Sequence, residues 1–202
     1  MNASSLHNLK QSRIVIVDDD FDYLTRCAEA LWRDGYLNCT PVAVFPSVIV
    51  AFKPRSALTP EELSQEARKL SDELKSAIQG QFSGMTEQEE YSKKIVPANV
   101  QSIVPSCKIV QPHLIILDTA LGQSKGYNLT KSIRKEIPNA KLIGSSGDPD
   151  YRRQWAQEGA DAFFHKDDYS HDQSEDLLRL VNAVLKDLPE AKKTLEGRIG
   201  GW

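Results

Sequence analysis

Acidic residues that follow two short apolar runs are the first candidates for chemistry in this sequence. Three consecutive aspartates come directly after residues 14–17, and Asp118 comes directly after residues 114–117. The consecutive aspartates are Asp18, Asp19 and Asp20. Crowded carboxylates repel one another unless a cation neutralises them, and oxygen ligands of this kind suit Mg²⁺. An aspartate can also act as a nucleophile and form an acyl phosphate.

Two further apolar runs end in groups that could bind an anion. Ser145 and Ser146 follow residues 141–144, and Lys166 follows residues 162–165. A hydroxyl and an ammonium beside a carboxylate cluster would hold two oxygens of an incoming phosphoryl group. The residue types therefore predict a site for a divalent cation and a phosphoryl group.

The elements that must position these residues follow from the hydrophobic pattern. The four apolar runs are continuous rather than alternating, which is typical of strands buried on both faces of a parallel sheet. Segments of helical period lie between them, including one marked by Leu24, Cys27 and Leu31. Alternating strands and helices predict an α/β fold with a doubly wound sheet, and ligands of such sheets bind beyond the carboxyl ends of the strands.

Helix signals also occur later in the sequence. Asp148 and Pro149 predict an N-cap and first turn before Trp155, and an apolar stripe from Leu177 to Leu188 predicts a last helix. The stretch 41–97 does not fit a minimal unit of this fold. Residues 42–52 are apolar enough for a strand, in one piece or in two pieces broken at Pro46, and residues 59–80 have a capping box and a helical stripe. We expect an inserted helical segment here.

Composition excludes several classes of protein. The chain has 202 residues, 26% of them charged, with a net charge of -3, which argues against direct nucleic-acid binding. No stretch approaches the roughly 20 apolar residues that span a bilayer. Three cysteines without metal-ligand spacing and a polar N-terminus with no apolar signal region predict a cytoplasmic location.

The ordered set of polar residues resembles the receiver domain of two-component response regulators, a CheY-like or flavodoxin-like fold. The matching residues are Asp18, Asp19, Asp118, Gly126, Ser145, Phe163 and Lys166. The resemblance covers roughly residues 12–40 and 99–187. It implies a five-stranded parallel sheet, a single domain over residues 1–187 with the insertion inside it, and a C-terminal tail over residues 188–202.

The resemblance also implies roles for these residues. Asp118 would accept a phosphoryl group. Asp18, Asp19, Asp118 and the backbone carbonyl of Ala120 would bind Mg²⁺, and Lys166 and Ser145 would bind the phosphoryl oxygens. Ser145 is preferred to Ser146 from the count back from Lys166. Ser145 and Phe163 would be the switch residues that reshape the face of the fourth helix, fifth strand and fifth helix.

Three features depart from the family's pattern. Asp19 and Asp118 lie 99 residues apart, whereas a strand-helix-strand-helix passage needs about 40 to 50. Gly122 stands where many members have proline after the phospho-acceptor, and Asp167 stands where proline usually follows the lysine. None of these departures removes a chemical group from the expected site.

The resemblance predicts a stand-alone receiver that is not an enzyme beyond slow autodephosphorylation. A histidine kinase or phosphotransfer protein would phosphorylate it. It would then act by contact with a target protein or as a homodimer, through the switch face or the insertion. We expect no membrane partner. A degenerate receiver that serves as a scaffold without phosphorylation is the alternative. A phosphatase resembling the haloacid dehalogenase group fits less well, since it leaves Asp118 and Gly126 without a role.

Overall fold

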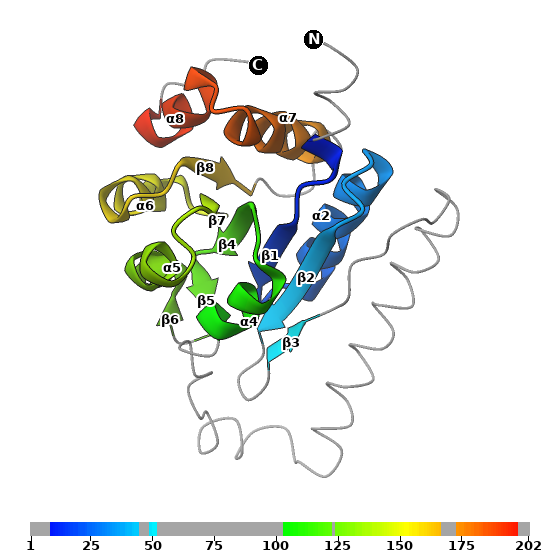
Figure 1. Ribbon diagram of the computed structural model, residues 1–202. Coiled ribbons are helices and arrows are strands. Elements are labelled where there is room, and N and C mark those ends of the chain that lie inside the picture. The colour runs from blue at the N-terminus through cyan, green and yellow to red at the C-terminus, as the bar shows by residue number, and fades with distance from the viewer. Residues whose placement is uncertain (1–8, 45–48, 52–102, 123, 167–172, 198–202) are drawn as a thin grey trace.

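A central sheet organises the chain in the computed structural model, which describes residues 9–44, 49–51, 103–122, 124–166 and 173–197. The sheet has six strands in the order β3-β2-β1-β4-β7-β8 (Figure 1). In that order, their bounds are Ile49–Ala51, Cys39–Val44, Ile14–Asp18, Leu114–Asp118, Lys141–Ser146 and Ala162–His165. All pairs are parallel except β2 with β3. The predicted five-stranded parallel sheet is therefore confirmed, with an antiparallel strand added at its β2 edge.

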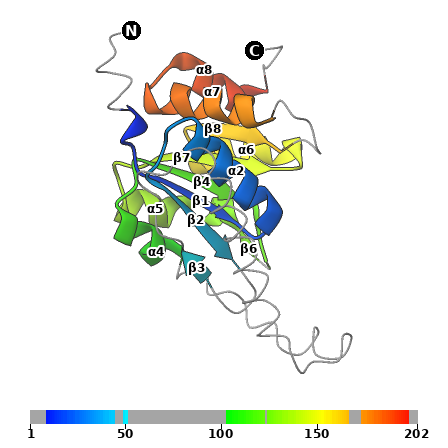
Figure 2. The same cartoon turned by 90° about the vertical axis from the view of Figure 1, so that its right-hand side faces the viewer.

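Helices cover both faces of the sheet, as the doubly wound prediction requires (Figure 2). One face packs against α2 (Phe21–Arg33) and α7 (Gln173–Leu185). The other packs against α4 (Ile103–Val110), α5 (Thr130–Glu136) and α6 (Arg152–Glu158). Strand β1 shows why its sequence is continuously apolar, because its successive side chains enter the two core layers alternately. Residues 14–17 are all fully buried.

Local signals set the starts of two helical segments, and the second of them, at Asp148, is the one predicted. The Asp20 side chain caps α2 by accepting a hydrogen bond of 3.0 Å from the Tyr23 N–H. Asp148 caps a short 3₁₀ turn (Pro149–Tyr151) that leads into α6, with the proline in the first turn. A second 3₁₀ turn (Gly126–Leu129) leads into α5. These caps fix where the chain turns after β1 and after β7.

The stretch predicted as one strand or two broken at Pro46 forms parts of two strands. The parallel strand β2 begins at Cys39 and ends at Val44, and β3 pairs with it in the antiparallel direction. The second strand of the parallel sheet therefore lies across the predicted start of the insertion at residue 41. The predicted helix over residues 59–80 and the residue Asp167 lie outside the described residues.

The predicted last helix and tail also differ from the structure. Helix α7 ends at Leu185, so Leu188, the last residue of the predicted apolar stripe, lies beyond the helix and is 41% exposed. Residues 189–196 of the predicted tail form helix α8 (Pro189–Glu196), which contacts α6, α7 and β8. Within the ranges described here, no helix is both long enough and apolar enough to cross a membrane.

Gly126 meets the end of β4 at a distance that no side chain could tolerate. A Cβ atom on Gly126 would lie 1.9 Å from the backbone oxygen of Asp118. The Gly126 N–H donates a hydrogen bond of 2.8 Å to the backbone oxygen of Thr119, so the two segments are joined by their backbones. The glycine eight residues after Asp118 is therefore a requirement of packing around the end of β4.

We expect Gly126→Ala to destabilise the fold by about 2 kcal/mol or more, because backbone must move to relieve the overlap. The free energy of unfolding from urea titration measures the loss. Gly147→Ala is the matched control, since its Cβ would meet only the backbone oxygen of Lys166, at an ordinary 3.7 Å. Equal stability of the two variants would contradict the packing described here.

Candidate functional site

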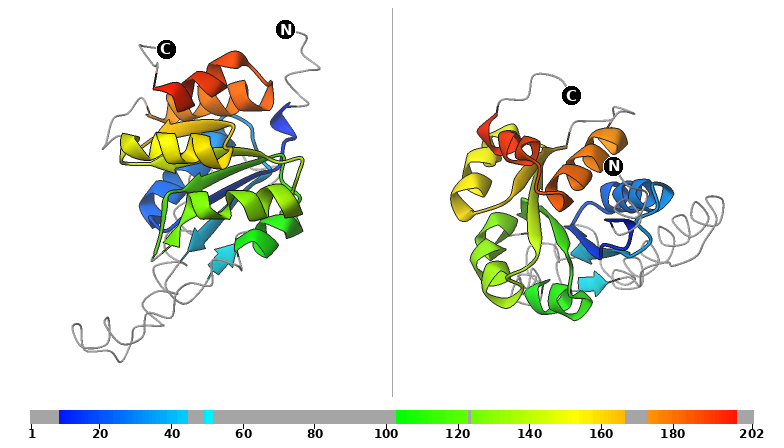
Figure 3. Two further views of the ribbon diagram at one scale, coloured as in Figure 1. Left: turned by 90° about the vertical axis from the view of Figure 1, so that its left-hand side faces the viewer. Right: turned by 45° about the horizontal axis from the view of Figure 1, so that its top comes forward.

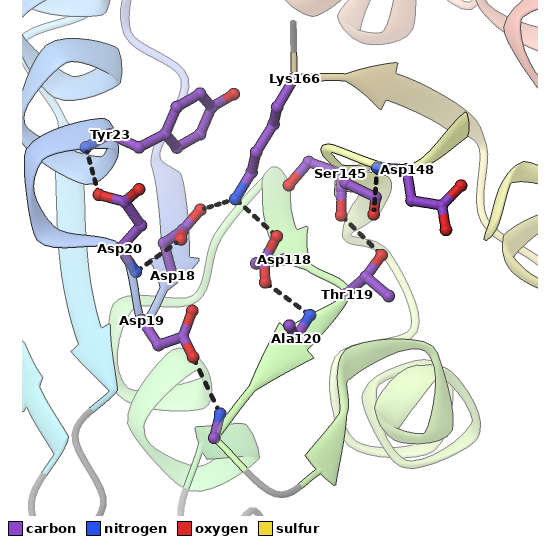
Figure 4. Close-up of polar contacts among 12 residues, drawn as sticks. Asp18, Asp19, Asp20, Tyr23, Asp118, Thr119, Ala120, Ser145, Asp148 and Lys166 are labelled. Atoms are coloured by element: carbon purple, nitrogen blue, oxygen red, sulfur yellow. Dashed lines mark hydrogen bonds and ion pairs between the residues drawn. The ribbon is translucent and has the colours of Figure 1, made fainter. Parts of the chain in front are cut away.

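The predicted polar residues meet at the carboxyl ends of the parallel strands, where such strands place their last residues together. Asp118 at the end of β4 pairs in register with Ser145 of β7, and Asp18 ends the neighbouring strand β1. Lys166 follows the last residue of β8. Figure 4 shows the Lys166 side chain pointing between Asp18 and Asp118. Four segments that are far apart in sequence thus place their chemical groups together.

The ammonium of Lys166 is the centre of the site. Its Nζ lies 2.6 Å from Oδ2 of Asp18 and 2.6 Å from Oδ1 of Asp118. The Asp18 side chain is 1% exposed, that of Asp118 6% and that of Lys166 14%. The Tyr23 ring adds a third contact, with its centroid 4.2 Å from Nζ. Charge-assisted hydrogen bonds and a cation–π contact therefore hold the lysine where few waters can compete.

Burial and charge have opposite effects on the titration of these groups. Burial raises the pKa of Asp18 to about 8; Lys166 opposes this rise and Asp118 adds to it. Burial likewise raises the pKa of Asp118, against the effect of Lys166 and of a hydrogen bond from Ala120. Burial would lower the pKa of Lys166, but Asp18 and Asp118 outweigh it and raise that pKa. The site has more carboxylates than it has cations to neutralise them.

The carboxylates are arranged in a way that fits a hard cation. Asp18, Asp19 and Asp118 each offer an oxygen, and these oxygens all lie within 4.8 Å of one another. Asp19 is exposed, so solvent can reach the cluster from that side. Two of these carboxylates are held by backbone N–H groups: the Gly122 N–H donates to Asp19 Oδ2 at 3.0 Å, and the Ala120 N–H donates to Asp118 Oδ2 at 2.6 Å. Clustered oxygens with one open side suit Mg²⁺, which retains waters when bound.

The two serines at the end of β7 have different environments. Ser146 Oγ accepts a hydrogen bond of 3.1 Å from the Asp148 N–H and is part of a turn. Ser145 Oγ is buried and has no hydrogen-bond partner among the residues described. A buried hydroxyl without a partner costs free energy, and a bound oxyanion beside Asp118 would supply that partner. This difference favours Ser145 over Ser146 as a phosphoryl ligand.

Sequence reasoning missed three residues that shape the site. Thr119 Oγ1 donates to the Ser145 backbone oxygen at 2.7 Å and accepts from the Trp155 indole N–H at 2.8 Å. Thr119 is 1% exposed, so this link between β4 and β7 is buried. The third missed residue is Tyr23, whose ring lies against Lys166. A threonine directly after the acidic strand end was visible in the sequence, but its partners come from other elements.

The loop after Asp118 forms a small hairpin of β5 (Ala120–Leu121) and β6 (Ser124–Lys125). Gly122, between these strands, has φ +61, which proline cannot adopt because its ring holds φ near −65°. The backbone conformation at this position therefore explains why Gly122 stands where many receivers have proline.

Phe163, which with Ser145 is a predicted switch residue, lies in β8, is 2% exposed and pairs in register with Gly144.

Comparison with known proteins shows the fold. No protein-family model and no curated protein matches the sequence. Solved structures match over most of the chain. The beryllofluoride-activated NtrC4 receiver domain dimer has 15% identity and a TM-score of 0.51, with 87% of this chain and 97% of that chain covered. The receiver domain of NtrX from Brucella abortus has 16% identity and a TM-score of 0.51, covering 86% and 98%.

A third similar structure contains a phosphorylated residue and a metal ion. It is a response regulator from Burkholderia pseudomallei with a phosphorylated aspartic acid, a calcium ion and citrate. It has 14% identity and a TM-score of 0.50, and the match covers 92% of this chain and 75% of that one. Taken with the strand order and register, these matches give a clear result. The chain has the fold of a response-regulator receiver domain, as its polar residues led us to expect.

We expect the stability of the metal-free protein to fall as pH rises from about 5 to 8. The folded-state pKa of Asp18 is about 8 against 3.8 for the free group, so over this window the folded protein binds a proton that the unfolded chain has lost. Asp18→Asn removes that titration. We expect Asp18→Asn to be more stable than wild type at pH 8, by on the order of 1–3 kcal/mol, and the gain to shrink at pH 5.

Urea titrations in EDTA at the two pH values measure this difference. Asp150→Asn, at an exposed position outside the cluster, is the control and should leave the pH dependence unchanged. An Asp18→Asn protein that is less stable than wild type at pH 8 would contradict the excess of buried negative charge.

Proposed function

We propose that this protein is a phospho-accepting switch in which Asp118 receives a phosphoryl group from a histidine kinase or phosphotransfer protein. One observation supports this above all: in a receiver fold, the Asp118 carboxylate is flanked by a buried lysine and by a buried hydroxyl that has no hydrogen-bond partner in the part of the chain described. A purely structural ion pair would explain Lys166. It would not explain the Ser145 hydroxyl or the open side at Asp19.

The chemistry is a direct transfer between two side chains. An oxygen of the Asp118 carboxylate attacks phosphorus, an O–P bond forms, and the bond between phosphorus and the donor's imidazole nitrogen breaks. The Lys166 ammonium, already 2.6 Å from Asp118, stabilises the negative charge on the phosphoryl oxygens. The Ser145 hydroxyl donates a hydrogen bond to another of them. Slow hydrolysis of the acyl phosphate would return the carboxylate.

The carboxylate cluster is the proposed Mg²⁺ site. Asp18, Asp19 and Asp118, with the backbone carbonyl of Ala120, would hold the ion. When bound, it supplies positive charge that offsets the repulsion between carboxylates and phosphoryl oxygens. The phosphorylated aspartic acid with a calcium ion in the Burkholderia pseudomallei response regulator supports this assignment, since that protein has the same fold.

The output of such a switch would be contact with another protein. Phosphorylation adds a charge of roughly −1.5 to −2, and Ser145 and Phe163 would respond to it. The face of α6, β8 and α7 corresponds to the predicted switch face, and the segment over residues 41–97 is a second candidate surface. We place the protein in the cytoplasm, as a receiver domain that includes α8, with a homodimer as one form of output.

Asp20 weakens the phosphatase alternative. That hypothesis takes Asp18 and Asp20 as an Asp-x-Asp pair after the first strand, but the Asp20 side chain caps α2 through the Tyr23 N–H. The scaffold alternative predicts no phosphorylation and is decided by the experiment below.

We expect incubation with acetyl phosphate and Mg²⁺ to add one phosphoryl group, seen by intact-mass spectrometry. EDTA should abolish the adduct, because the carboxylates and the phosphoryl oxygens then repel each other without a cation. Asp118→Asn should also abolish it, whereas Asp150→Asn should not. Absence of any adduct in wild type, under conditions that label an ordinary receiver, would favour the scaffold.

The serine pair offers a matched test of the phosphoryl ligand. We expect Ser145→Ala to slow phosphorylation by about tenfold or more, since it removes a hydrogen bond made to the transferred group. Ser146→Ala should change the rate by less than about threefold, since its hydroxyl serves a turn. The rate of adduct formation under fixed acetyl phosphate measures both, and the reverse ranking would show that Ser146 is the ligand.

A further inference from the structure

Helix α8 lies along the outer edge of β8 and fills the space between α6 and α7 (Figure 3). Its Ala191 is buried in the core layer on the α2 and α7 side. Its Leu195 packs against the core layer on the α4, α5 and α6 side. The helix therefore contributes to both layers at the β8 edge of the sheet.

One polar contact joins α8 to the strand. Strand β8 ends the sheet in the described part of the chain, so its outward N–H groups lack a neighbouring strand. The Phe163 N–H instead donates a hydrogen bond of 2.8 Å to Oγ1 of Thr194, and that hydroxyl donates one of 2.6 Å to the Ala191 oxygen. The Thr194 residue is 2% exposed. A side-chain hydroxyl thus takes the place of a missing strand.

Phe163 also connects this contact to the site. It lies three residues before Lys166 and pairs with Gly144, the neighbour of Ser145. Its ring is in the same core cluster as Leu195 and lies 5.4 Å from the Arg152 guanidinium. Gly144 is packed directly against the Trp155 ring, since a Cβ atom on Gly144 would lie 2.1 Å from that ring. Phe163, whose N–H anchors α8, is therefore the residue that connects the segments of Ser145 and Lys166 to this helix.

We propose that α8 is a detachable cover on the β8 edge, whose attachment is linked to the phosphoryl state of Asp118. The inference rests on the proposed function and goes beyond it. A phosphoryl group on Asp118 attracts the Lys166 ammonium and the Ser145 hydroxyl, and the strands next to these residues, β8 and β7, respond. Loss of the fit between Phe163 and Thr194 releases α8, and an isolated helix of eight residues is not stable in water. Release therefore unfolds α8 and exposes the β8 edge.

Hydrogen exchange of the full chain, read by mass spectrometry, tests the linkage. Beryllofluoride with Mg²⁺ serves as the phosphoryl mimic, and ¹⁹F NMR reports separately whether it is bound. With the mimic bound, we expect the amides of α8 to exchange at least about fivefold faster while those of α2 keep their rates. Bound beryllofluoride with unchanged exchange in α8 would overturn the linkage and leave the proposed function intact.

A pair of variants tests the attachment without any ligand. Thr194→Val keeps the shape of the side chain but leaves the Phe163 N–H unpaired, so exchange in α8 should rise on the order of tenfold. Thr194→Ser keeps the hydroxyl and should stay near wild type. Because linkage is reciprocal, Thr194→Val should also bind beryllofluoride at least about threefold more tightly.

The outcomes separate the two ideas. No beryllofluoride binding would overturn the proposed function and the linkage together, while the exchange of Thr194→Val would still show whether α8 detaches separately. Unchanged exchange in α8 of Thr194→Val would overturn the cover itself, whatever the site binds.

Discussion

The ammonium of Lys166 between Asp18 and Asp118 is the interaction on which the rest of the site depends. Two carboxylates this deeply buried repel each other when ionised, and the positive charge between them lowers the free energy of their ionised forms. The lysine joins the ends of three strands, β1, β4 and β8, that would otherwise bring like charges together. It does not offset both carboxylates, because Asp18 still has a pKa of about 8, and a divalent cation that binds the cluster would take the place of the proton on Asp18.

The surroundings of this ion pair divide into fixed and free groups. Gly126, Thr119 and the Ala120 N–H hold the end of β4 by backbone contact and buried hydrogen bonds, so the Asp118 carboxylate keeps one orientation. The Ser145 hydroxyl, by contrast, has no partner in the described structure, and Asp19 faces solvent. A fixed carboxylate beside an unsatisfied donor and an accessible cluster of carboxylates is the arrangement that the proposed phosphoryl transfer needs.

Much of this could be predicted from the sequence because it depends on local pattern. Continuous apolar runs predict buried parallel strands, and parallel strands place their carboxyl ends together, so Asp118, Ser145 and Lys166 had to meet. The contacts that depend on three-dimensional packing were missed: Thr119 with Trp155, and the Tyr23 ring with Lys166. The antiparallel β3 and the helix α8 were missed for a related reason. Short or weakly apolar segments take their structure from the surface they pack on rather than from their own periodicity.

The most direct test is to identify the residue that accepts the phosphoryl group. Borohydride reduces an acyl phosphate to an alcohol and leaves free carboxylates unchanged, so a phosphorylated aspartate becomes homoserine. After treatment with acetyl phosphate and Mg²⁺, peptide mass mapping should find homoserine at position 118 and at no other aspartate. Homoserine at position 18 or 19, or a stable phosphoryl group on a serine, would contradict the assignment of Asp118 as the acceptor.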